Sequence, residues 1–563
     1  RFSSCNTRDM YKTVNELLNV SSNVLPVCQD SSDLAEDFSK HFVNKVVKIK
    51  EDIESTIPTR SDVSSVSTGK PDIGFAQFGH VGEGVLGGLI AKCSSKSCSL
   101  DPMPTWLVKR HLTVLLPVML RIVNLSLSTG VFPEALRCSV IAPVLKKSSL
   151  DRDDLNNYRP VSNIPFLGKV IEKAVSKQVS DFVNQNDLLD PMQSAYRVAH
   201  STETALLSLQ NDVLRAIDNK QAVFLLMLDL SSAFDTVDHT ILSHRLAEDF
   251  GLGDNVLSWF RSYLSNRSSR VHVSGSFSND QHLTFGIPQG SIIGPQLFTY
   301  YIRCIGNIIG QHSIQHHVYA DDIQMFTIFD PTKPGDAVCA YFRLSKCLED
   351  IQAWLVMSKL KLNSSKTEFF IAGSQSHLNR LKNQSFSIGD QNIPISSTIR
   401  DLGVVFDGEM KMSDHVTNLC RTLNWQIYNL NRIRKYLDRE TCHNVVRALV
   451  LSRLDYGGCL LGGISKKDLG RLQRLQNKCA RLIYQKPKWS HATPLLQELH
   501  WLPVADRIQY RILVQTFKST STTLPVYISS LFQQQRTSYS LRSSSAPTFV
   551  IPKSRKQAGF KSR

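Results

Sequence analysis

Residues 222–229 read Ala-Val-Phe-Leu-Leu-Met-Leu-Asp, a continuous apolar run that ends in a carboxylate. The run is too short for an independent helix and is typical of a strand that is buried on both faces. A helix is expected just before it, from a cap at Ser201 or Thr202 to about Asn219, because apolar residues recur there at spacings of three and four. Asp229 is therefore expected at the end of a buried strand.

A second predicted strand end carries two more carboxylates. Residues 316–329 read His-His-Val-Tyr-Ala-Asp-Asp-Ile-Gln-Met-Phe-Thr-Ile-Phe, so two β-prone runs flank a short acidic turn and predict a tight hairpin. Asp321 and Asp322 lie at its tip. Taken alone, this pair is as consistent with an ordinary turn as with a functional site, since Asp is a common turn residue.

Three carboxylates at strand ends indicate a cation site. Buried carboxylates are costly and repel one another unless positive charge compensates them. Hard oxygen ligands suit Mg²⁺, and two such ions about 4 Å apart can activate an attacking 3′-hydroxyl and stabilise a departing pyrophosphate. Asp229, Asp321 and Asp322 are thus candidate ligands for phosphoryl-transfer chemistry.

Three segments, in chain order, closely resemble motifs of the reverse transcriptase family. They are Asp229-Leu-Ser-Ser-Ala-Phe-Asp-Thr-Val-Asp-His239, Gly286-Ile-Pro-Gln-Gly-Ser-Ile-Ile-Gly-Pro295 and Tyr319-Ala-Asp-Asp322. They are similar to the first, second and third palm motifs of non-LTR, or LINE-type, retrotransposon polymerases. Further agreement occurs at 141–147, 157–162, 193–197, 201–203, 360–363, 366–368 and 401–404, so that the resemblance spans about residues 90–510.

The resemblance implies an α+β, right-hand polymerase fold, with fingers, an antiparallel palm sheet, a helical thumb and a C-terminal region. It makes Asp229, Asp321 and Asp322 the catalytic, metal-binding triad, with the Leu230 carbonyl as a further ligand. Phe234 resembles the aromatic gate that excludes a 2′-hydroxyl and so favours dNTPs. The alternative for Phe234 is a core aromatic.

The same resemblance implies roles for residues outside the triad. Arg159 and Lys147 are expected to hold the triphosphate, although Lys146 could serve in place of Lys147, whose alternative is a solvated loop charge. Gln289 and Gly290 resemble the loop that packs against the incoming nucleotide and the template; the alternative is an ordinary Pro-Gln-Gly turn. Lys366 resembles the lysine proposed to protonate the pyrophosphate leaving group.

The charge of the chain is unevenly distributed. Lys and Arg exceed Asp and Glu by 16 over 563 residues. Residues 411–563 hold 26 basic and 7 acidic residues, a net charge of +19, which leaves 39 against 42, or −3, for residues 1–410. The C-terminal part is therefore expected to bind an anionic partner.

Residues 411–485 show helical periodicity with basic residues beside the apolar stripes. We expect these residues to contact the backbone of a template-primer, with affinity that falls steeply with salt. The alternative is a solvated helix face. The predicted nucleic-acid-binding residues are Arg471, Arg474, Lys478, Arg481, Arg432 and Lys435.

The length predicts three or four units, and the domain organisation follows the motifs. We expect a helical connector remnant over 1–60, a Ser-rich linker over 61–89, a helical extension over 90–127, fingers and palm over 128–405, a basic helical thumb over 406–485 and a basic, truncated C-terminal region over 486–563. The absence of an 18-residue apolar run argues against a membrane span.

Together these features predict an RNA-directed DNA polymerase that uses two Mg²⁺ ions, with Mn²⁺ as a substitute. Its partners are an RNA template, a DNA primer or target and dNTPs, with no membrane. Scattered cysteines favour an intracellular protein with reduced thiols, in the nucleus or cytoplasm as a ribonucleoprotein. The chain is expected to be a fragment without the endonuclease of its relatives. The main alternative is a non-enzymatic, nucleic-acid-binding remnant of a decayed element; an RNA-dependent RNA polymerase agrees less well with Phe234.

Overall fold

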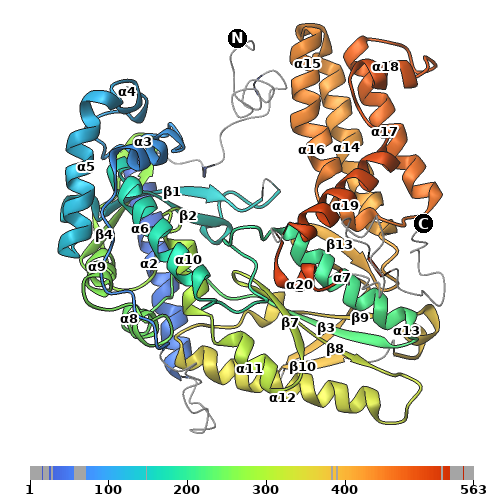
Figure 1. Ribbon diagram of the computed structural model, residues 1–563, viewed down its shortest axis with the longest axis horizontal. Coiled ribbons are helices and arrows are strands. Elements are labelled where there is room, and N and C mark those ends of the chain that lie inside the picture. Colours follow the sequence, from blue (N-terminus) through green and yellow to red (C-terminus); the bar gives the residue numbers. More distant parts are fainter. Residues whose placement is uncertain are drawn as a thin grey trace, which may run out of the picture.

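Two larger β-sheets, a small hairpin and the surrounding helices make up the computed structural model (Figure 1). The predicted α+β right-hand fold is confirmed, with fingers elements on the left of Figure 1, the palm sheet at the lower right and thumb helices at the upper right. Part of the predicted linker, 61–70, lies outside the described residues. The structure describes residues 16, 25–26, 30–55, 71–147, 149–381, 385–388, 391–521, 524–532 and 549–550.

The palm is a six-stranded sheet in the order β10-β11-β9-β3-β8-β7. Its centre, β3, pairs antiparallel with both β8 and β9, and β8 pairs antiparallel with β7. The predicted strand and hairpin are therefore confirmed. The strands are β3 (Ala222–Leu228), β7 (Gln315–Tyr319), β8 (Asp322–Phe329), β9 (Glu368–Ala372), β10 (Ser385–Ile388) and β11 (Gln391–Ser396).

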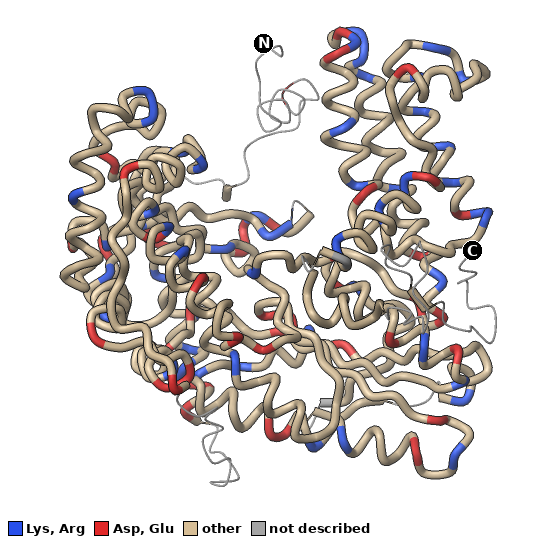
Figure 2. Tube along the Cα trace, viewed as in Figure 1, with Lys and Arg blue, Asp and Glu red and all other residues tan. Residues whose placement is uncertain are grey.

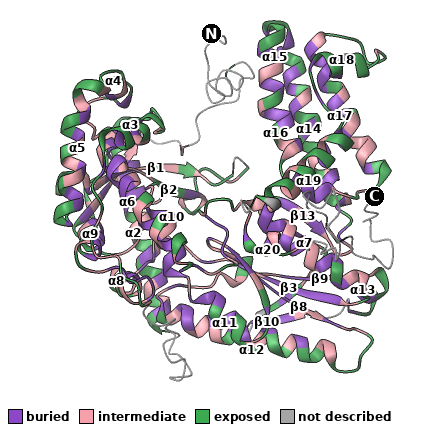
Figure 3. Ribbon diagram, viewed as in Figure 1, coloured by how far each residue is buried: buried purple, intermediate pink, exposed green. Residues whose placement is uncertain are grey.

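Strand β3 lies between two hydrophobic cores. Phe224 and Leu226 belong to the core shared with the fingers helices, whereas Val223 and Leu225 belong to the core shared with the thumb. Because successive side chains of a strand point to opposite faces, a strand with a core on each face needs an unbroken apolar run. The buried strands of this sheet are drawn in purple in Figure 3.

Helices α7 and α12 flank the palm strands. The predicted helix before β3 is α7 (Thr202–Asp218), and its cap is a capping box between Ser201 and Thr204. Helix α12 (Asp336–Met357) follows β8 and packs against it. The helix predicted upstream of the strand is thus confirmed, with Ser201 as its N-cap.

The fingers contain a second sheet, in the order β2-β1-β4-β5, with β6 paired to β4. Strands β1 and β4 pair in parallel. In the sequence they are separated by palm strand β3, which belongs to the other sheet. The strands are β1 (Cys138–Leu145), β2 (Tyr158–Asn163), β4 (Arg267–Val273), β5 (Ser276–Phe277) and β6 (Gln281–Leu283). The helices are α3 (Glu83–Ala91), α4 (Thr105–Arg110), α5 (Leu112–Thr129), α6 (Phe166–Gln185), α8 (His239–Glu248), α9 (Asp254–Leu264), α10 (Gly294–Tyr301) and α11 (Ile305–Gln311).

The N-terminal helix α2 (Ser31–Ser55) connects the fingers to the palm. Phe38 is fully buried and its ring lies 4.9 Å from that of Tyr158 on β2. At the other end of the helix, the Asp52 carboxylate lies 2.8 Å from Lys361 Nζ, just before β9. The first helical stretch of the sequence therefore packs against both the fingers and the segment that precedes β9.

One helix in the described ranges passes a membrane-span test on length and composition. Helix α5 has a mean hydropathy of 1.6, and only 22% of it is buried. From the sequence we expected no apolar segment long enough to span a membrane, whereas α5 is long and apolar enough by length and composition alone. Leu116 and Val123 nevertheless pack into the fingers core, so that α5 has one buried face, while Val114 and Val118 are exposed.

The thumb is a helical bundle joined to the palm by a β-hairpin. Figure 2 shows Lys and Arg at intervals along its helices. Helices α18 and α19 pack against the same core as α14 and α17 through Leu496, Trp501 and Val504. The elements are β12 (Thr398–Asp401), β13 (Val404–Asp407), α14 (Ser413–Ile433), α15 (Arg439–Val446), α16 (Ser452–Asp455), α17 (Lys466–Tyr484), α18 (Thr493–Glu498), α19 (Val504–Thr520) and α20 (Val526–Ser529).

Candidate active site

Asp229, Asp321 and Asp322 meet at one end of the palm sheet. The register pairs Leu228 with Ile323, which places Asp229, at the end of β3, beside the first residue of β8. Burial, followed by the Asp229 carboxylate, raises the pKa of Asp321. Burial and the carboxylates of Asp321 and Asp229 raise the pKa of Asp322 to about 6. The three carboxylates therefore act on one another, as their positions at strand ends predict.

The turn that carries Asp321 is held from outside the hairpin. Tyr319 pairs with Asp322, which leaves Ala320 and Asp321 as the two turn residues. Ala320 has a φ of +57°, a conformation that is costly for a residue with a Cβ. Its backbone N–H donates to Gln193 Oε1 at 3.3 Å. Gln193 is thus a support of the acidic turn, although the sequence motif alone gave it no role.

Asp229 is held by the segment that precedes β9. Asn363 donates its backbone N–H to the Asp229 carbonyl at 2.8 Å, and its side-chain amide to Asp229 Oδ2 at 2.9 Å. The Lys366 ammonium lies 3.0 Å from the same Oδ2 atom. The structure therefore brings Lys366 to the triad as predicted, and it adds Asn363, whose only sequence signal was its place in the same motif.

The donor set fits a hard divalent cation by its chemistry. Three interacting carboxylates offer oxygen ligands of the kind that Mg²⁺ prefers. Within the described ranges, no group of three or more His, Cys, Asp or Glu side chains is arranged closely enough to hold an ion. The Oδ2 atom of Asp229 instead accepts hydrogen bonds from the Lys366 ammonium and the Asn363 amide.

Positive charge reaches the triad from the fingers. Arg159 lies on β2, is exposed, and counteracts the rise in the pKa of Asp321. Lys146 donates to the Asn156 carbonyl at 2.6 Å, and burial, followed by the charges of Lys45, Lys366 and Arg159, lowers its pKa. Lys147 is exposed. Of the two candidate lysines, Lys146 is the one whose charge interacts with Arg159 and Lys366.

Phe234 lies in the loop after β3 and is half-buried. Its ring stacks on Phe298 of α10, with the centroids 4.9 Å apart and an interplanar angle of 23°. Its carbonyl accepts a hydrogen bond from the Ile287 N–H at 2.8 Å. The ring is therefore fixed on one side by the core, an arrangement that a rigid gate and an ordinary core aromatic would share.

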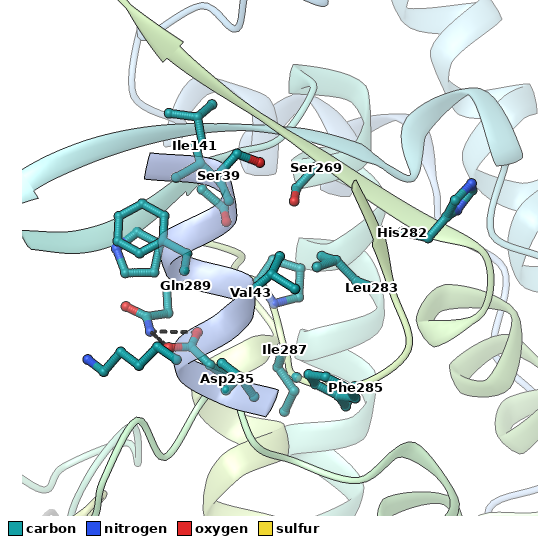
Figure 4. A pocket seen from close by; sticks show the side chains of 18 residues that line it. Ser39, Val43, Ile141, Asp235, Ser269, His282, Leu283, Phe285, Ile287 and Gln289 are labelled. Carbon is teal, nitrogen blue, oxygen red and sulfur yellow. Dashed lines mark hydrogen bonds between the residues drawn. The ribbon is translucent and has the colours of Figure 1, made fainter. Parts of the chain in front are cut away.

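Gln289 is engaged within the protein. Its side-chain amide donates to both carboxylate oxygens of Asp235 at 2.8 Å (Figure 4). Asp235 is half-buried, and burial raises its pKa to about 6. Both side chains line a pocket between α2 and the loop that contains Pro288, with Val43 and Phe285 on its wall (Figure 4). Gln289 thus has a partner within the protein, and its contact with an incoming nucleotide stays a prediction.

Gly290 is required by a close approach to β2. Its φ is +119°, and a Cβ at this position would lie 2.4 Å from the Ser162 carbonyl oxygen. The Ser162 N–H donates to the Gln289 carbonyl at 2.6 Å. A glycine is therefore needed to join this loop to the fingers sheet, whatever further role the loop has.

A buried acid lies behind the triad. Asp401, at the end of β12, is fully buried and its Oδ1 accepts from Gln324 Nε2 at 2.7 Å. Burial, followed by the Asp322 carboxylate, raises the pKa of Asp401 to about 8. A carboxyl group with this pKa is mostly protonated at neutral pH. The sequence places Asp401 in one of the segments that resemble the family, but it gives no sign that this side chain is buried beside Gln324.

The predicted basic stripe of α17 is partly used inside the thumb. Arg471 Nη1 lies 3.0 Å from Asp468 Oδ1, Lys478 Nζ donates to Asn424 Oδ1 at 2.9 Å, and Arg481 Nε donates to the Ser490 carbonyl at 2.8 Å. These contacts stabilise the bundle. For Arg471 in particular, the predicted contact with a nucleic-acid backbone would compete with an internal ion pair.

A second surface, on α14 and the turn after it, combines exposed aromatic and basic residues. Trp425, Tyr428 and Tyr436 are 58%, 64% and 61% exposed. Arg432 and Lys435, two of the predicted residues, are exposed on the same stretch. We call these five residues the α14 face. Periodicity analysis predicted its charges but overlooked the aromatics among them.

Comparisons with known proteins agree with this geometry. Residues 144–406 match the family model described as "Reverse transcriptase (RNA-dependent DNA polymerase)". The chain is 24% identical over 396 residues to the "RNA-directed DNA polymerase from mobile element jockey" of Drosophila melanogaster, a match that covers 69% of this chain and 42% of the relative. It is 25% identical over 396 residues to the "Probable RNA-directed DNA polymerase from transposon X-element" of the same species, covering 67% and 41%.

The chain thus spans about two fifths of the length of these relatives. Among solved structures, an apo telomerase from Candida tropicalis, truncated from its C-terminal domain, matches with a TM-score of 0.34 and 12% identity. That match covers 49% of this chain and 54% of the telomerase chain.

Proposed function

Because residues 144–406 form a reverse transcriptase domain similar to those of non-LTR retrotransposon polymerases, we propose that the chain extends a DNA 3′-hydroxyl on an RNA template. The observation that carries the proposal is the meeting of three interacting carboxylates at the end of β3 and the tip of the β7–β8 hairpin. Partly buried carboxylates such as Asp321 and Asp322, whose pKa values are raised by burial and by neighbouring carboxylates, are typical of a site that binds cations during catalysis.

The reverse transcriptase family generally uses divalent metal ions. Asp229, Asp321 and Asp322 are the residues that would hold Mg²⁺, or Mn²⁺ in its place, and the bound ions would supply activation of the 3′-hydroxyl and neutralisation of charge on the departing pyrophosphate. Asn363 keeps Asp229 in place through two hydrogen bonds. The Gln193 contact does the same for the turn at Asp321.

Lys366 supplies the proton that the leaving group needs. Its ammonium is 66% exposed and lies 3.0 Å from Asp229 Oδ2, so that it stands at the triad while its remaining N–H groups face solvent. The 3′-hydroxyl oxygen forms a bond to the α-phosphorus of the dNTP as the bond from that phosphorus to the pyrophosphate oxygen breaks. The 3′-hydroxyl proton passes to solvent, the departing pyrophosphate takes a proton from Lys366 Nζ, and solvent reprotonates the exposed lysine. Arg159 and Lys146 hold the triphosphate from the fingers side, and Phe234, backed by Phe298, limits the space for a 2′-hydroxyl.

The α14 face binds the template-primer. Aromatic side chains stack on bases and basic side chains pair with phosphates, and the combination is typical of surfaces that bind nucleic acid. The alternative function, a nucleic-acid-binding remnant that cannot polymerise, rests on the same face, because it requires none of the triad. The two proposals therefore differ only at the palm.

The test is primer extension on poly(rA)/oligo(dT) with dTTP and Mg²⁺. The wild type should extend the primer, and Asp321→Asn should lower the rate by at least about a thousandfold, because it removes a carboxylate that would hold the metal ions. Asp153→Asn, an exposed acid of the fingers, is the matched control and should retain wild-type activity. Equal extension by wild type and Asp321→Asn would refute the catalytic assignment, and filter binding without extension would favour the remnant.

A further inference from the structure

The C-terminal helices α19 and α20, which we call the C-terminal clasp, return from the thumb to the palm. Arg507 Nη2 lies 2.7 Å from Asp455 Oδ2 at the base of the thumb. Arg511 Nη2 then lies 2.9 Å from Glu203 Oε2 in the first turn of α7. Figure 1 shows the clasp, in red, beside α7. The last helix of the clasp, α20, contacts α7 and carries Tyr527.

Tyr527 is buried and enters a hydrogen-bond network beneath the acidic hairpin. Its hydroxyl lies 2.6 Å from Ser194 Oγ and 3.1 Å from Thr204 Oγ1. Ser194 Oγ in turn lies 2.8 Å from His317 Nε2 on β7. The Tyr527 ring meets the His317 ring edge-on, at 4.9 Å and 89°. Burial is the main cause that lowers the pKa of His317 to about 4, so the network is made by neutral groups.

The segment that contains Ser194 is the outer partner of β7. Strand β7 lies at the edge of the palm sheet. The Ser194 N–H donates to the Val318 carbonyl at 2.9 Å, and the Val318 N–H donates to the Met192 carbonyl at 3.1 Å. The same segment presents Gln193 to Ala320, next to Asp321. A short segment therefore stabilises the edge strand on which the catalytic turn depends, and Tyr527 holds this segment in place.

We propose that Tyr527 is a positioning residue for the reaction: through Ser194 and His317 it fixes the β7–β8 hairpin and hence Asp321 and Asp322. The inference rests on the proposed polymerase function. Tyr527 touches none of the three aspartates in this arrangement; its effect is transmitted by the hydrogen bonds described above. The C-terminal clasp is then part of the catalytic apparatus, and the polymerase depends on residues well beyond its palm and thumb.

The test uses the full chain with Tyr527→Phe, which removes one hydroxyl and keeps the ring. The kcat for dTTP incorporation should fall about fivefold, the effect expected for one buried hydrogen bond, while the KM for dTTP stays unchanged. Ser194→Ala should have a similar effect, and the double variant should lower kcat by less than the product of the two single effects, because both substitutions remove the hydrogen bond between Tyr527 and Ser194. Tyr510→Phe, at an exposed tyrosine of α19, is the matched control.

Amide hydrogen exchange supplies a readout that does not require activity. Residues 315–323 should exchange faster in Tyr527→Phe than in the wild type, while exchange in Tyr510→Phe stays at the wild-type rate. Unchanged exchange at the hairpin, or unchanged kcat in an active enzyme, would overturn the positioning role. If the wild type fails to extend primers, the proposed function fails, and the exchange comparison by itself then supports or overturns the contact between Tyr527 and the hairpin.

Discussion

The palm and the thumb use charge in opposite ways. In the palm, the important charges are carboxylates at strand ends, drawn into contact with partners such as Asn363 and Lys366. In the thumb, several basic residues are paired inside the bundle, and the exposed ones share the α14 face with aromatic rings. In the palm, a charged side chain with partners at the triad is therefore the best candidate for a functional residue. In the thumb, the best candidates are the exposed basic residues.

The strongest test of this contrast is at Lys366. Lys366→Ala should lower kcat on the order of a hundredfold, because a general acid near the leaving group is lost. Single-turnover incorporation of dTTP measures the effect, and Lys366→Arg should retain more activity than Lys366→Ala. Lys333→Ala, an exposed lysine, serves as the control. If Lys366→Ala and Lys333→Ala behaved alike, the ion pair with Asp229 would have no catalytic meaning.

Phe234 tests whether a partly buried ring of the palm acts on the substrate. Phe234→Ala should raise the use of rUTP relative to dTTP by roughly tenfold, since the truncated side chain leaves room for the 2′-hydroxyl. The ratio of kcat/KM values for the two nucleotides is the measurement. Phe342→Ala removes an exposed ring of α12 and should leave the ratio unchanged. No gain in ribonucleotide use would favour the alternative, in which Phe234 is only a core aromatic.

The thumb half of the contrast is tested by comparing α14 with α17. Trp425→Ala should weaken template-primer binding at least about fivefold, because the stacking of one base contributes about 1–3 kcal/mol. Arg471→Ala should change the dissociation constant less than about twofold, since the guanidinium already pairs with Asp468. Filter binding over a range of salt concentrations measures both. Trp489→Ala, at another exposed tryptophan, is the control, and a larger effect for Arg471 than for Trp425 would reverse the assignment.

The smallest expected effect concerns stability. Because the pKa of Asp401 is raised to about 8 in the fold, its contribution is fully present below the unfolded-state pKa of about 4 and is lost as the pH rises through about 8. Asp401→Asn should remove this dependence, so that the Tm of the wild type falls relative to the variant by about 2 °C between pH 5 and 8. Parallel Tm profiles would show that Asp401 is ionised in the fold.

The sequence predicted the palm more fully than the thumb. Strand β3 was predictable because a two-faced burial requires an unbroken apolar run, and the hairpin was predictable because its turn is flanked by β-prone runs. Asp229, Asp321 and Asp322 followed from those strand ends. Their supports, Asn363 and Gln193, were not predictable, because an amide side chain leaves no periodic pattern and its partner is distant in sequence.

The sequence defines the thumb surface less sharply than the palm, for a physical reason. A basic stripe on a helix gives no sign of which residues the neighbouring helices will use, and Arg471, Lys478 and Arg481 all find partners within the thumb. Gln289 shows the same limit in the palm, since its pairing with Asp235 depends on a tertiary contact. The role of Tyr527 could not be predicted either, because its partners lie more than 300 residues earlier in the chain.

The parallel pairing of β1 with β4 has a consequence for synthesis on the ribosome. Strand β1 is complete at Leu145, but its partner begins at Arg267, after the whole of α6, α7 and β3 has been made. Helix α2 also packs on β4, so this contact cannot form before β4 has been made. Strand β1 and helix α2 therefore complete their contacts with β4 only after residue 273 has been made, and the ion pair between Asp52 of α2 and Lys361 forms later still.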